Sequence, residues 1–272
     1  MSLRIQTNVE AFNAHRNLVG TSSALAKSME RLSSGYRINR AADDAAGLAI
    51  SEKMKAQIGG LQQAQRNSQD AVSLVQTAEG AMSEVHSMLQ RVRDLAVQYN
   101  NGTLSTADKA AITVEVQALG SEIQRIASQT KFNDIALLSG GSSITFQVGA
   151  EGTDTLSVTL VTLAGSGNGA SVDTGIFDFG TGTVTLASID DAITNVATAR
   201  ATFGSVQNRL EHTLNNLATY EENLSASESR IKDVDMASEM VNFTKLQILQ
   251  QAGTSMLAQA NSAPQSVLSL LR

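Results

Sequence analysis

The sequence has 272 residues, a net charge of −6 and a pI near 5.1, which argues against nucleic acid as a main ligand. Cysteine is absent, aromatic residues make up 4% of the chain, and there is a single proline, Pro264. Disulfides and thiol chemistry are therefore excluded, and aliphatic side chains must fill any core, which favours long packed helices. No apolar run is long enough to span a bilayer, and the N-terminal segment lacks the apolar stretch of a signal peptide. We expect no membrane span, and either a cytosolic location or export without signal cleavage.

The first predicted element is a helix that carries two apolar stripes. Both stripes repeat at coiled-coil spacing, one position out of phase, and they consist of Ile5, Val9, Phe12 and Val19 and of Leu18, Leu25 and Leu32. Gly35 follows the last turn, where a residue tolerant of positive φ is expected to end the helix. The segment is predicted to form one strand of a narrow coiled coil.

The stretch RLSSGYRINRAADDAAGLAI then interrupts the helical pattern. Its charged residues are three cations and two adjacent carboxylates, namely Arg31, Arg37, Arg40, Asp43 and Asp44. Adjacent residues on a helix do not face each other, so we interpret the carboxylates as a helix N-cap and its dipole partner instead of an acid/base pair. Arg37 and Arg40 form either a solvated face or, because they flank a break in the helix, an intermolecular ion pair.

A second helix, predicted from about Asp44 to Gln98, carries the strongest periodicity in the chain. Its core positions alternate steps of three and four without a break, and they are Leu61, Ala64, Ser68, Ala71, Val75, Ala78, Met82, Val85, Leu89, Val92, Ala96 and Tyr99. Ser105 to Asp108 has the pattern of a capping box and predicts the start of a third helix. That helix keeps the same rhythm at Ile112, Val116, Leu119, Ile123 and Ile126.

The composition changes in the next segment. Residues 139–188 hold half of the chain's 20 glycines and no lysine or arginine. SITFQVG, TLSVTLVTL and TVTLAS alternate in the manner of short strands, and AGSGNGAS has the composition of a flexible loop. We expect a small β-rich insertion at residues 141–188.

Helical patterns return after about Ile189. One apolar series is spaced at seven residues throughout, and it consists of Val196, Phe203, Leu210, Leu217, Leu224 and Ile231. A final helix repeats at Val234, Val241 and Ile248, with Leu249, Met256 and Leu257 beside them, and is predicted to break at Asn261–Pro264. The predicted fold is mainly α: a long antiparallel coiled coil or helix bundle with paired N- and C-terminal helices and a small β-rich insertion.

No catalytic constellation is found in the sequence. His15, His86 and His212 are isolated and lack the spacing of metal ligands. The GSGNG stretch has no strand–turn–helix context, and neither a P-loop lysine motif nor G-x-S-x-G nor H-E-x-x-H occurs. We expect no enzyme activity and no cofactor.

Several motifs closely resemble those of bacterial flagellins. They are RLSSGYRINRAADDAAGLAI, LQRVRDLAVQ (Leu89–Gln98), QTKFNDIALLSG (Gln129–Gly140) and QQAGTSMLAQANSAPQSVLSLLR (Gln250–Arg272). The resemblance covers roughly residues 1–140 and 189–272, and the insertion matches no motif. Two positions depart from the usual pattern: Gln6 stands where asparagine is common, and Tyr36 where leucine is frequent.

The resemblance implies a division of the chain into layers of a filament. Residues 1–35 with 234–272 would form an inner-tube coiled coil, 36–43 a connector, 44–140 with 189–233 a layer of long helices with a hairpin near 139–149, and 141–188 a variable outer insertion. The assembly seam would consist of Ile5, Val9, Phe12, Leu18, Leu25, Leu32, Val234, Val241, Ile248 and Met256. Because one partner helix offers these ends few apolar contacts, we expect them to order only on assembly.

The resemblance further implies function and partners. The chain would be a structural subunit that polymerises into the helical flagellar filament, secreted by a type III route. Its partners would be further copies of itself, an export chaperone on the C-terminal segment, and cap and junction proteins, with no nucleic acid and no membrane. The Toll-like receptor that recognises flagellin would contact Arg91, Leu95 and Glu115. The alternatives are a hook–filament junction protein and, third, an enzyme; the DDAAG and SVLSLLR motifs favour the filament subunit.

Overall fold

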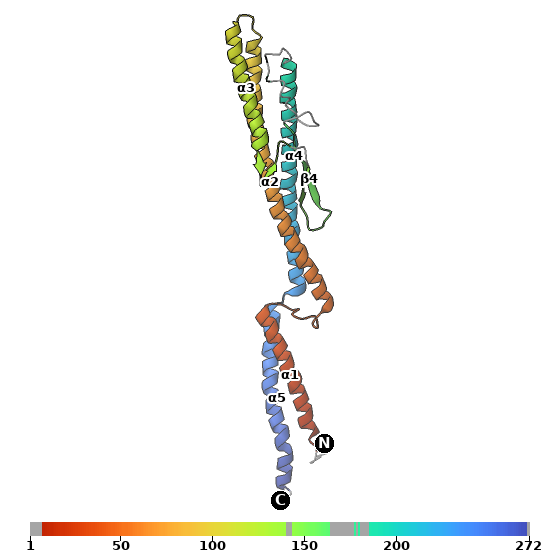
Figure 1. Ribbon diagram of the computed structural model, residues 1–272. Helices are drawn as coiled ribbons and strands as arrows, with labels where there is room; N and C mark the ends of the chain where they lie inside the picture. Colours follow the sequence, from red (N-terminus) through yellow and green to blue (C-terminus); the bar gives the residue numbers. More distant parts are fainter. Residues whose placement is uncertain (1–6, 140–142, 164–176, 178, 180–184, 271–272) are drawn as a thin grey trace. The chain divides into compact units, whose positions relative to one another are not determined.

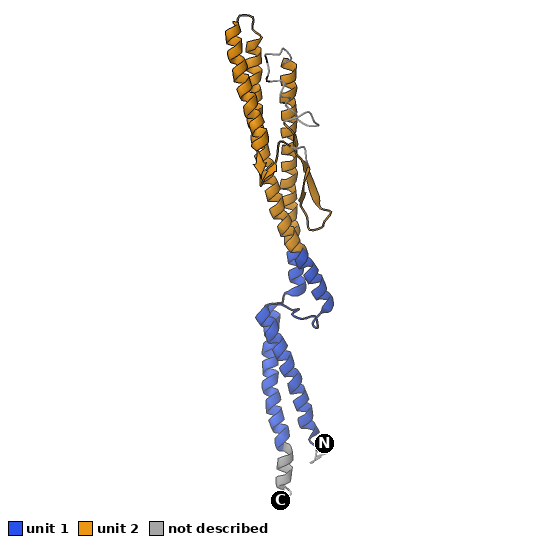
Figure 2. Cartoon of the chain, in the orientation of Figure 1, with its two compact units in different colours: residues 1–56, 223–272 blue, residues 57–222 orange. Residues whose placement is uncertain are grey.

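The computed structural model describes residues 7–139, 143–163, 177, 179 and 185–270. These residues form, in chain order, α1 (Val9–Ser34), α2 (Ala45–Tyr99), α3 (Thr106–Gln129), β1 (Lys131–Phe132), β2 (Ile135–Ala136), β3 (Ser143–Gln147), β4 (Thr155–Thr159), α4 (Leu186–Lys232) and α5 (Met236–Leu270) (Figure 1). The chain divides into a terminal unit, Met1–Ala56 with Asn223–Arg272, and a central unit, Gln57–Glu222 (Figure 2). The prediction of a mainly α fold with paired terminal helices and a small β portion is confirmed.

In the terminal unit, α1 and α5 lie side by side and run antiparallel (Figure 1). Asn8 caps α1, since its side chain accepts a hydrogen bond from the Ala11 amide at 3.0 Å. At the other end Gly35 adopts φ 76°, and its amide donates to the Arg31 carbonyl, which confirms the predicted end of the helix.

Helix α5 continues through Pro264 as far as Leu270, so the predicted break at Asn261–Pro264 is wrong. A proline inside a helix removes one i to i−4 hydrogen bond, here the bond to the carbonyl of Ala260. That carbonyl has another donor, because the side-chain amide of Asn8 reaches it at 2.7 Å. The helix thus continues past a residue that usually ends one.

The core of the central unit is the stripe that the sequence predicted on α2. Its predicted positions from Leu61 to Ala96 are all buried, and Tyr99 is half-buried. Ser68, the polar member, is fully buried and donates its hydroxyl hydrogen to the carbonyl of Ala64 at 2.8 Å. With 55 residues, α2 is about 80 Å long at about 1.5 Å per residue.

Helices α3 and α4 complete this core with their own predicted stripes. The buried residues are Ile112, Val116, Gly120, Ile123 and Ala127 on α3, and Ile189, Ala192, Val196, Ala199, Phe203, Val206, Leu210 and Leu217 on α4. Ser105 and Asp108 form the predicted capping box of α3. Because small alanines alternate with larger side chains along all three helices, the backbones pack closely with few aromatic residues.

Polar contacts align α2 with α4 along the central unit. Arg93 binds Asp190 at 2.6 Å, Arg200 binds Glu79 at 2.8 Å, and Glu221 accepts from the side chains of Gln62 and Gln65 at 2.7 and 2.8 Å. The partner numbers fall on one helix as they rise on the other, which fits an antiparallel pair. Exposed pairs of this kind contribute about 0.2–1 kcal/mol each, so they fix alignment more than stability.

Two hairpins make up the β portion of the described chain. Strands β1 and β2 are joined by Asn133 and Asp134, whose φ values of 47° and 64° match the two-residue turn with positive φ at both positions. Strands β3 and β4 pair antiparallel from Ser143 opposite Thr159 to Gln147 opposite Thr155. The amide of Asn67 on α2 donates to the Gln147 carbonyl at 3.1 Å and holds this second hairpin on the bundle.

The structure corrects four details of the sequence interpretation in this region. The β1–β2 hairpin was not predicted, and the second hairpin extends to Thr159 instead of ending near residue 149. The strand predicted from TLSVTLVTL stops at Thr159. Leu186–Ser188, predicted as the end of a strand, is the first turn of α4, since the hydroxyl of Thr185 accepts from the Ser188 amide in the manner of a cap. The predicted loop AGSGNGAS lies outside the described residues.

Candidate functional site: the connector and the terminal helix pair

Residues 35–44 connect α1 to α2, and they pair with the short crossing from α4 to α5. The amide of Val234 donates to the Gly35 carbonyl at 3.0 Å, and the amide of Arg37 donates to the Lys232 carbonyl at 2.7 Å. Tyr36 and Asp233 form an isolated antiparallel bridge, and the Lys232 ammonium lies 5.0 Å from the centre of the Tyr36 ring. The two crossings thus hold each other in place, although neither is a helix or a strand.

Asp43 organises the connector with both of its carboxylate oxygens. One oxygen lies 2.6 Å from the ammonium of Lys27 on α1, and the other accepts from the amides of Asn39 and Arg40 at 3.2 and 3.1 Å. The hydrogen bond from Lys27, followed by the two amide bonds, lowers the pKa of Asp43 from 3.8 to about 2. The carboxylate is therefore fixed in its charged form and ties the connector to α1.

Asp44 is the N-cap that the sequence predicted. Its side chain accepts from the amide of Gly47 at 2.9 Å and thereby satisfies a free donor in the first turn of α2. Gly47 is required at this point, because a Cβ there would lie 2.5 Å from an oxygen of Asp44 and 2.7 Å from the Cδ1 of Ile38. Ile38 is 2% exposed, so the glycine makes room for both the cap and a buried anchor.

The basic residues of the connector have partners within the chain. Arg40 binds Glu30 at 2.8 Å, Arg37 donates to the Ile231 carbonyl at 2.6 Å, and Arg31 lies 3.8 Å from Glu239. The Arg31 pair belongs to the α1–α5 interface, where Glu239 is 8% exposed. Arg37 and Arg40 are exposed, as expected of a solvated face, and their contacts tie the connector within the chain, whereas the intermolecular ion pair stays a prediction.

The interface between α1 and α5 is made by one stripe on each helix. On α1 the stripe consists of the half-buried or buried residues Ala11, Ala14, Leu18, Thr21, Leu25, Ser28 and Leu32, and on α5 of Glu239, Phe243, Leu246, Gln250, Gly253, Leu257 and Ala260. Glu30, Arg31 and Ser34, near the end of α1, are half-buried as well. Both series alternate steps of three and four, as in a coiled coil. Many of the members are small or polar, so the paired helices bury little apolar surface.

The predicted seam residues are divided between this interface and the opposite faces of the two helices. Leu18, Leu25 and Leu32 are half-buried in the interface, and Val234 is half-buried just before α5. The remaining ones are exposed: Val9 60%, Phe12 65%, Val241 68%, Ile248 61% and Met256 66%; Ile5 lies outside the described residues. Within one chain α1 and α5 thus pair through only one of their two apolar sides, and an assembly seam at the exposed positions stays a prediction.

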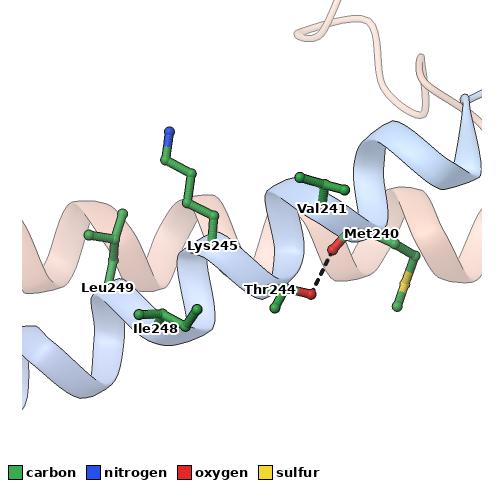
Figure 3. A pocket seen from close by; sticks show the side chains of 6 residues that line it. All are labelled: Met240, Val241, Thr244, Lys245, Ile248 and Leu249. Carbon is green, nitrogen blue, oxygen red and sulfur yellow. Dashed lines mark hydrogen bonds between the residues drawn. The ribbon is translucent and has the colours of Figure 1, made fainter.

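The exposed residues form what we call the outer stripes. On α1 the outer stripe consists of Val9, Phe12 and Val19, and on α5 of Met240, Val241, Ile248, Leu249 and Met256. Figure 3 shows a shallow groove on α5 lined by Met240, Val241, Thr244, Lys245, Ile248 and Leu249. Exposed apolar rows of this length are unusual on a chain that acts alone and mark a surface that binds another molecule.

The seam residues that the sequence interpretation missed had a detectable signal. Phe243, Leu246, Gly253 and Leu257 alternate at three and four residues, but the sevens at Val241 and Ile248 gave the more obvious pattern. Gln250 and Glu239 stand in that series as polar members and weakened it. Two apolar series on one helix indicate two apolar faces.

The predicted receptor residues are also divided by the structure. Arg91 and Glu115 are exposed and form an ion pair at 2.7 Å between α2 and α3. Leu95 is 2% exposed and belongs to the core of the central unit. Its inclusion in a surface patch is corrected, because Leu95 belongs to the buried stripe of α2 together with Val92 and Ala96.

The described residues hold no cluster of three or more metal-ligating side chains, and the helices among them are all too polar or too short to cross a bilayer. What they do hold is a pair of helices, α1 and α5, whose outer apolar faces have no partner in this chain and whose connector is held by hydrogen bonds and ion pairs. This arrangement defines a helical structural protein whose candidate site is a protein-binding surface.

Comparison with known proteins gives the family. The model of the bacterial flagellin N-terminal helical region matches residues 5–143, and that of the bacterial flagellin C-terminal helical region matches residues 186–271. The chain is 51% identical over 271 residues to a flagellin of Halalkalibacterium halodurans, covering 98% of this chain and 99% of the relative. It is 47% identical to a flagellin of Bacillus subtilis, covering 99% and 100%. The chain therefore belongs to the bacterial flagellin family.

A solved structure shows the same fold at lower identity. A putative flagellar hook-associated protein from Vibrio parahaemolyticus aligns with 70% of this chain and 100% of its own, with a TM-score of 0.59 and 16% identity. At this identity the likeness concerns the fold alone. The hook–filament junction alternative has no support from the relatives, which are named flagellin and match almost the whole chain.

Proposed function

We propose that this chain is the structural subunit of a bacterial flagellar filament and that it polymerises through the outer stripes of α1 and α5. The observation that carries the proposal is that these stripes remain exposed after the two helices have paired with each other. A surface used repeatedly between copies, without closure, generates a helical polymer. No enzymatic role is proposed, since the family is structural.

Substitution on the outer stripe of α5 tests this proposal. Ile248→Ser removes a large exposed apolar side chain, and burial of such a side chain contributes about 1.5–3 kcal/mol, so the critical concentration for assembly should rise more than tenfold. Gln247→Ser is the matched control, because residue 247 is its exposed polar neighbour. Sedimentation and electron microscopy would measure assembly. Equal assembly of the two variants would contradict the use of this stripe.

We infer that the terminal helices become ordered only on assembly. The α1–α5 interface supports this inference, since it relies on small and polar residues such as Ala11, Ser28 and Gly253. Hydrogen exchange of a non-polymerising monomer measures it directly. Strong protection of the α1 amides in that monomer would refute the inference, whereas fast exchange that slows in the filament is expected.

We further propose the assignment of segments to layers of the filament that the family implies. Residues 1–35 with 234–272 would line the inner tube, 36–43 would connect the layers, 44–140 with 189–233 would surround the tube, and 141–188 would face outward. The close spacing of Ile38, Asp44 and Gly47 favours a shaped connector between layers. A helical reconstruction of the filament would test the assignment, and an outward-facing α5 would contradict it.

Export and accessory partners form a further proposal. The subunit would be secreted by the type III route, with an export chaperone on the C-terminal segment and with cap and junction proteins at the ends of the filament. The outer stripe of α5 supports a chaperone site, because an exposed apolar helix face requires cover before assembly. Ile248→Ser should then weaken chaperone binding in a titration, and unchanged affinity would exclude this face.

Recognition by the flagellin-sensing Toll-like receptor is proposed for the surface around Arg91 and Glu115 alone. Both side chains are about half exposed, so a partner could replace their mutual ion pair. Arg91→Ala should reduce receptor activation in a reporter assay while leaving the helical content unchanged. Full activation by this variant would remove Arg91 from the proposal.

A further inference from the structure

Asn8 makes two hydrogen bonds that serve different helices. Its Oδ1 accepts from the amide of Ala11 at 3.0 Å and caps α1. Its Nδ2 donates to the carbonyl of Ala260 on α5 at 2.7 Å, across 252 positions of sequence. The cap of one terminal helix is therefore bound to the backbone of the other.

The carbonyl that Asn8 binds is the one that lacks its α-helical donor. In an α-helix the carbonyl of residue 260 accepts from the amide of residue 264. Residue 264 is the single proline of the chain and has no amide hydrogen, yet α5 continues to Leu270. An unsatisfied carbonyl at a half-buried position is unfavourable, so a side-chain donor is specifically stabilising there.

We propose that Asn8 and Pro264 form a matched pair that fixes the axial register of α1 on α5. The proline frees one carbonyl, and the asparagine amide binds it. Elsewhere along a regular helix the carbonyls are already bonded, so the amide has one favoured docking position. A slip of α1 by one residue moves Asn8 by about 1.5 Å and by one turn by about 5.4 Å, and either slip breaks the bond.

The interface itself needs such a device, because small side chains on both helices define register weakly. Ala11 and Ala14 on α1 and Gly253 and Ala260 on α5 are small, half-buried residues of this interface. At Gly253 the facing side chain is Leu18, whose Cδ1 would lie 3.2 Å from a Cβ at that glycine. The inference rests on the proposed function to the extent that a fixed register sets which residues each outer stripe presents to the next copy.

A double-substitution cycle in the full-length chain tests the pairing. Asn8→Asp keeps the oxygen that caps α1 and removes the donor to Ala260, and aspartate is as good an N-cap as asparagine. Pro264→Ala returns the α-helical amide to the Ala260 carbonyl. Asn13→Asp is the charge control, because it adds the same charge at an exposed position of α1.

The expected result is strong coupling between the two sites. Asn8→Asp should raise the critical concentration for assembly about tenfold in the parent chain and less than about twofold in the Pro264→Ala background, since only the parent leaves the carbonyl unsatisfied. Asn13→Asp should have the same small effect in both backgrounds. An equal effect of Asn8→Asp in both backgrounds would overturn the pairing.

Cross-linking in assembled filaments reads the register directly, because the terminal helices are proposed to be ordered there. The chain has no cysteine, and the Cβ of Leu18 lies 4.0 Å from a Cβ built at Gly253, within the range of a disulfide. We expect Leu18→Cys to cross-link with Gly253→Cys in preference to Leu257→Cys in the parent chain. This preference should be lost with Asn8→Asp, with Pro264→Ala and with both, because each change removes the bond between Asn8 and the Ala260 carbonyl. An unchanged preference in all four backgrounds would refute the register role, even if the proposed polymerisation is correct. Conversely, the expected cross-links together with unimpaired assembly of Ile248→Ser would count against the proposed function alone.

Discussion

Gly47→Ala is predicted to destabilise the connector although alanine is the better helix former. The added Cβ would lie 2.7 Å from the Cδ1 of Ile38 and 2.5 Å from a carboxylate oxygen of Asp44, both too close for a real contact. Displacing the cap costs about 0.5–2 kcal/mol. Shifting the buried isoleucine costs about 1–3 kcal/mol, against a gain of at most about 1 kcal/mol in helix propensity. The expected net loss in the free energy of unfolding is about 0.5–4 kcal/mol.

The assay is denaturant-induced dissociation and unfolding of assembled protein, followed by circular dichroism. Gly80→Ala is the matched control, because Gly80 lies within the same helix with open space around it and should gain about 1 kcal/mol. Adding Ile38→Val to Gly47→Ala should recover part of the loss by removing the clashing methyl group. If Gly47→Ala stabilises the protein as much as Gly80→Ala does, the steric reasoning is wrong.

Three further predictions follow from the same structure. Because the pKa of Asp43 is lowered to about 2, its stabilising effect is present above about pH 4 and is lost as the pH falls through about 2. Asp43→Asn should therefore flatten the acid-unfolding profile of the assembled protein in this range. Lys27→Met should move the profile toward higher pH, because it removes the hydrogen bond that lowers the pKa most. An unchanged acid profile would contradict the Asp43 contacts. Leu95→Ala should lower the free energy of unfolding of the central unit by about 2–5 kcal/mol, since Leu95 is 2% exposed. Arg91→Ala should change it by less than about 0.5 kcal/mol, as its ion pair is exposed; denaturant titration separates these two, and a reversed order would refute the burial assignment.

The family's assembly behaviour has a plain physical basis in the terminal helices. Each carries one stripe for its intramolecular partner and a second stripe that this partner leaves exposed. Such a helix pair leaves apolar surface uncovered in one chain, and in our proposal further copies cover it. The contacts of the connector give every copy the same local geometry at the end of α1 and the start of α5.

Local rules in the sequence were sufficient for the elements of the central unit. The unbroken three-and-four spacing from Leu61 to Ala96 predicted a stripe that is buried throughout, because a 3.6-residue period places those side chains on one face whatever they contact. The caps at Asp44 and Ser105 were equally predictable, since an N-cap acts within its own first turn. The Asn133–Asp134 turn was also readable in principle, because these residue types tolerate positive φ.

What only the tertiary structure decided was the choice between alternatives that are equal locally. Periodicity identified apolar stripes on α1 and α5 but not which of them faces the partner, because that depends on how two helices fit together. Proline usually ends a helix, yet α5 continues past Pro264, with the carbonyl it frees bound by a residue 252 positions away. Interactions within a few residues therefore determine where each helix begins and which of its stripes are apolar, and these can be predicted from the sequence. Contacts between distant segments decide which stripe faces the partner helix.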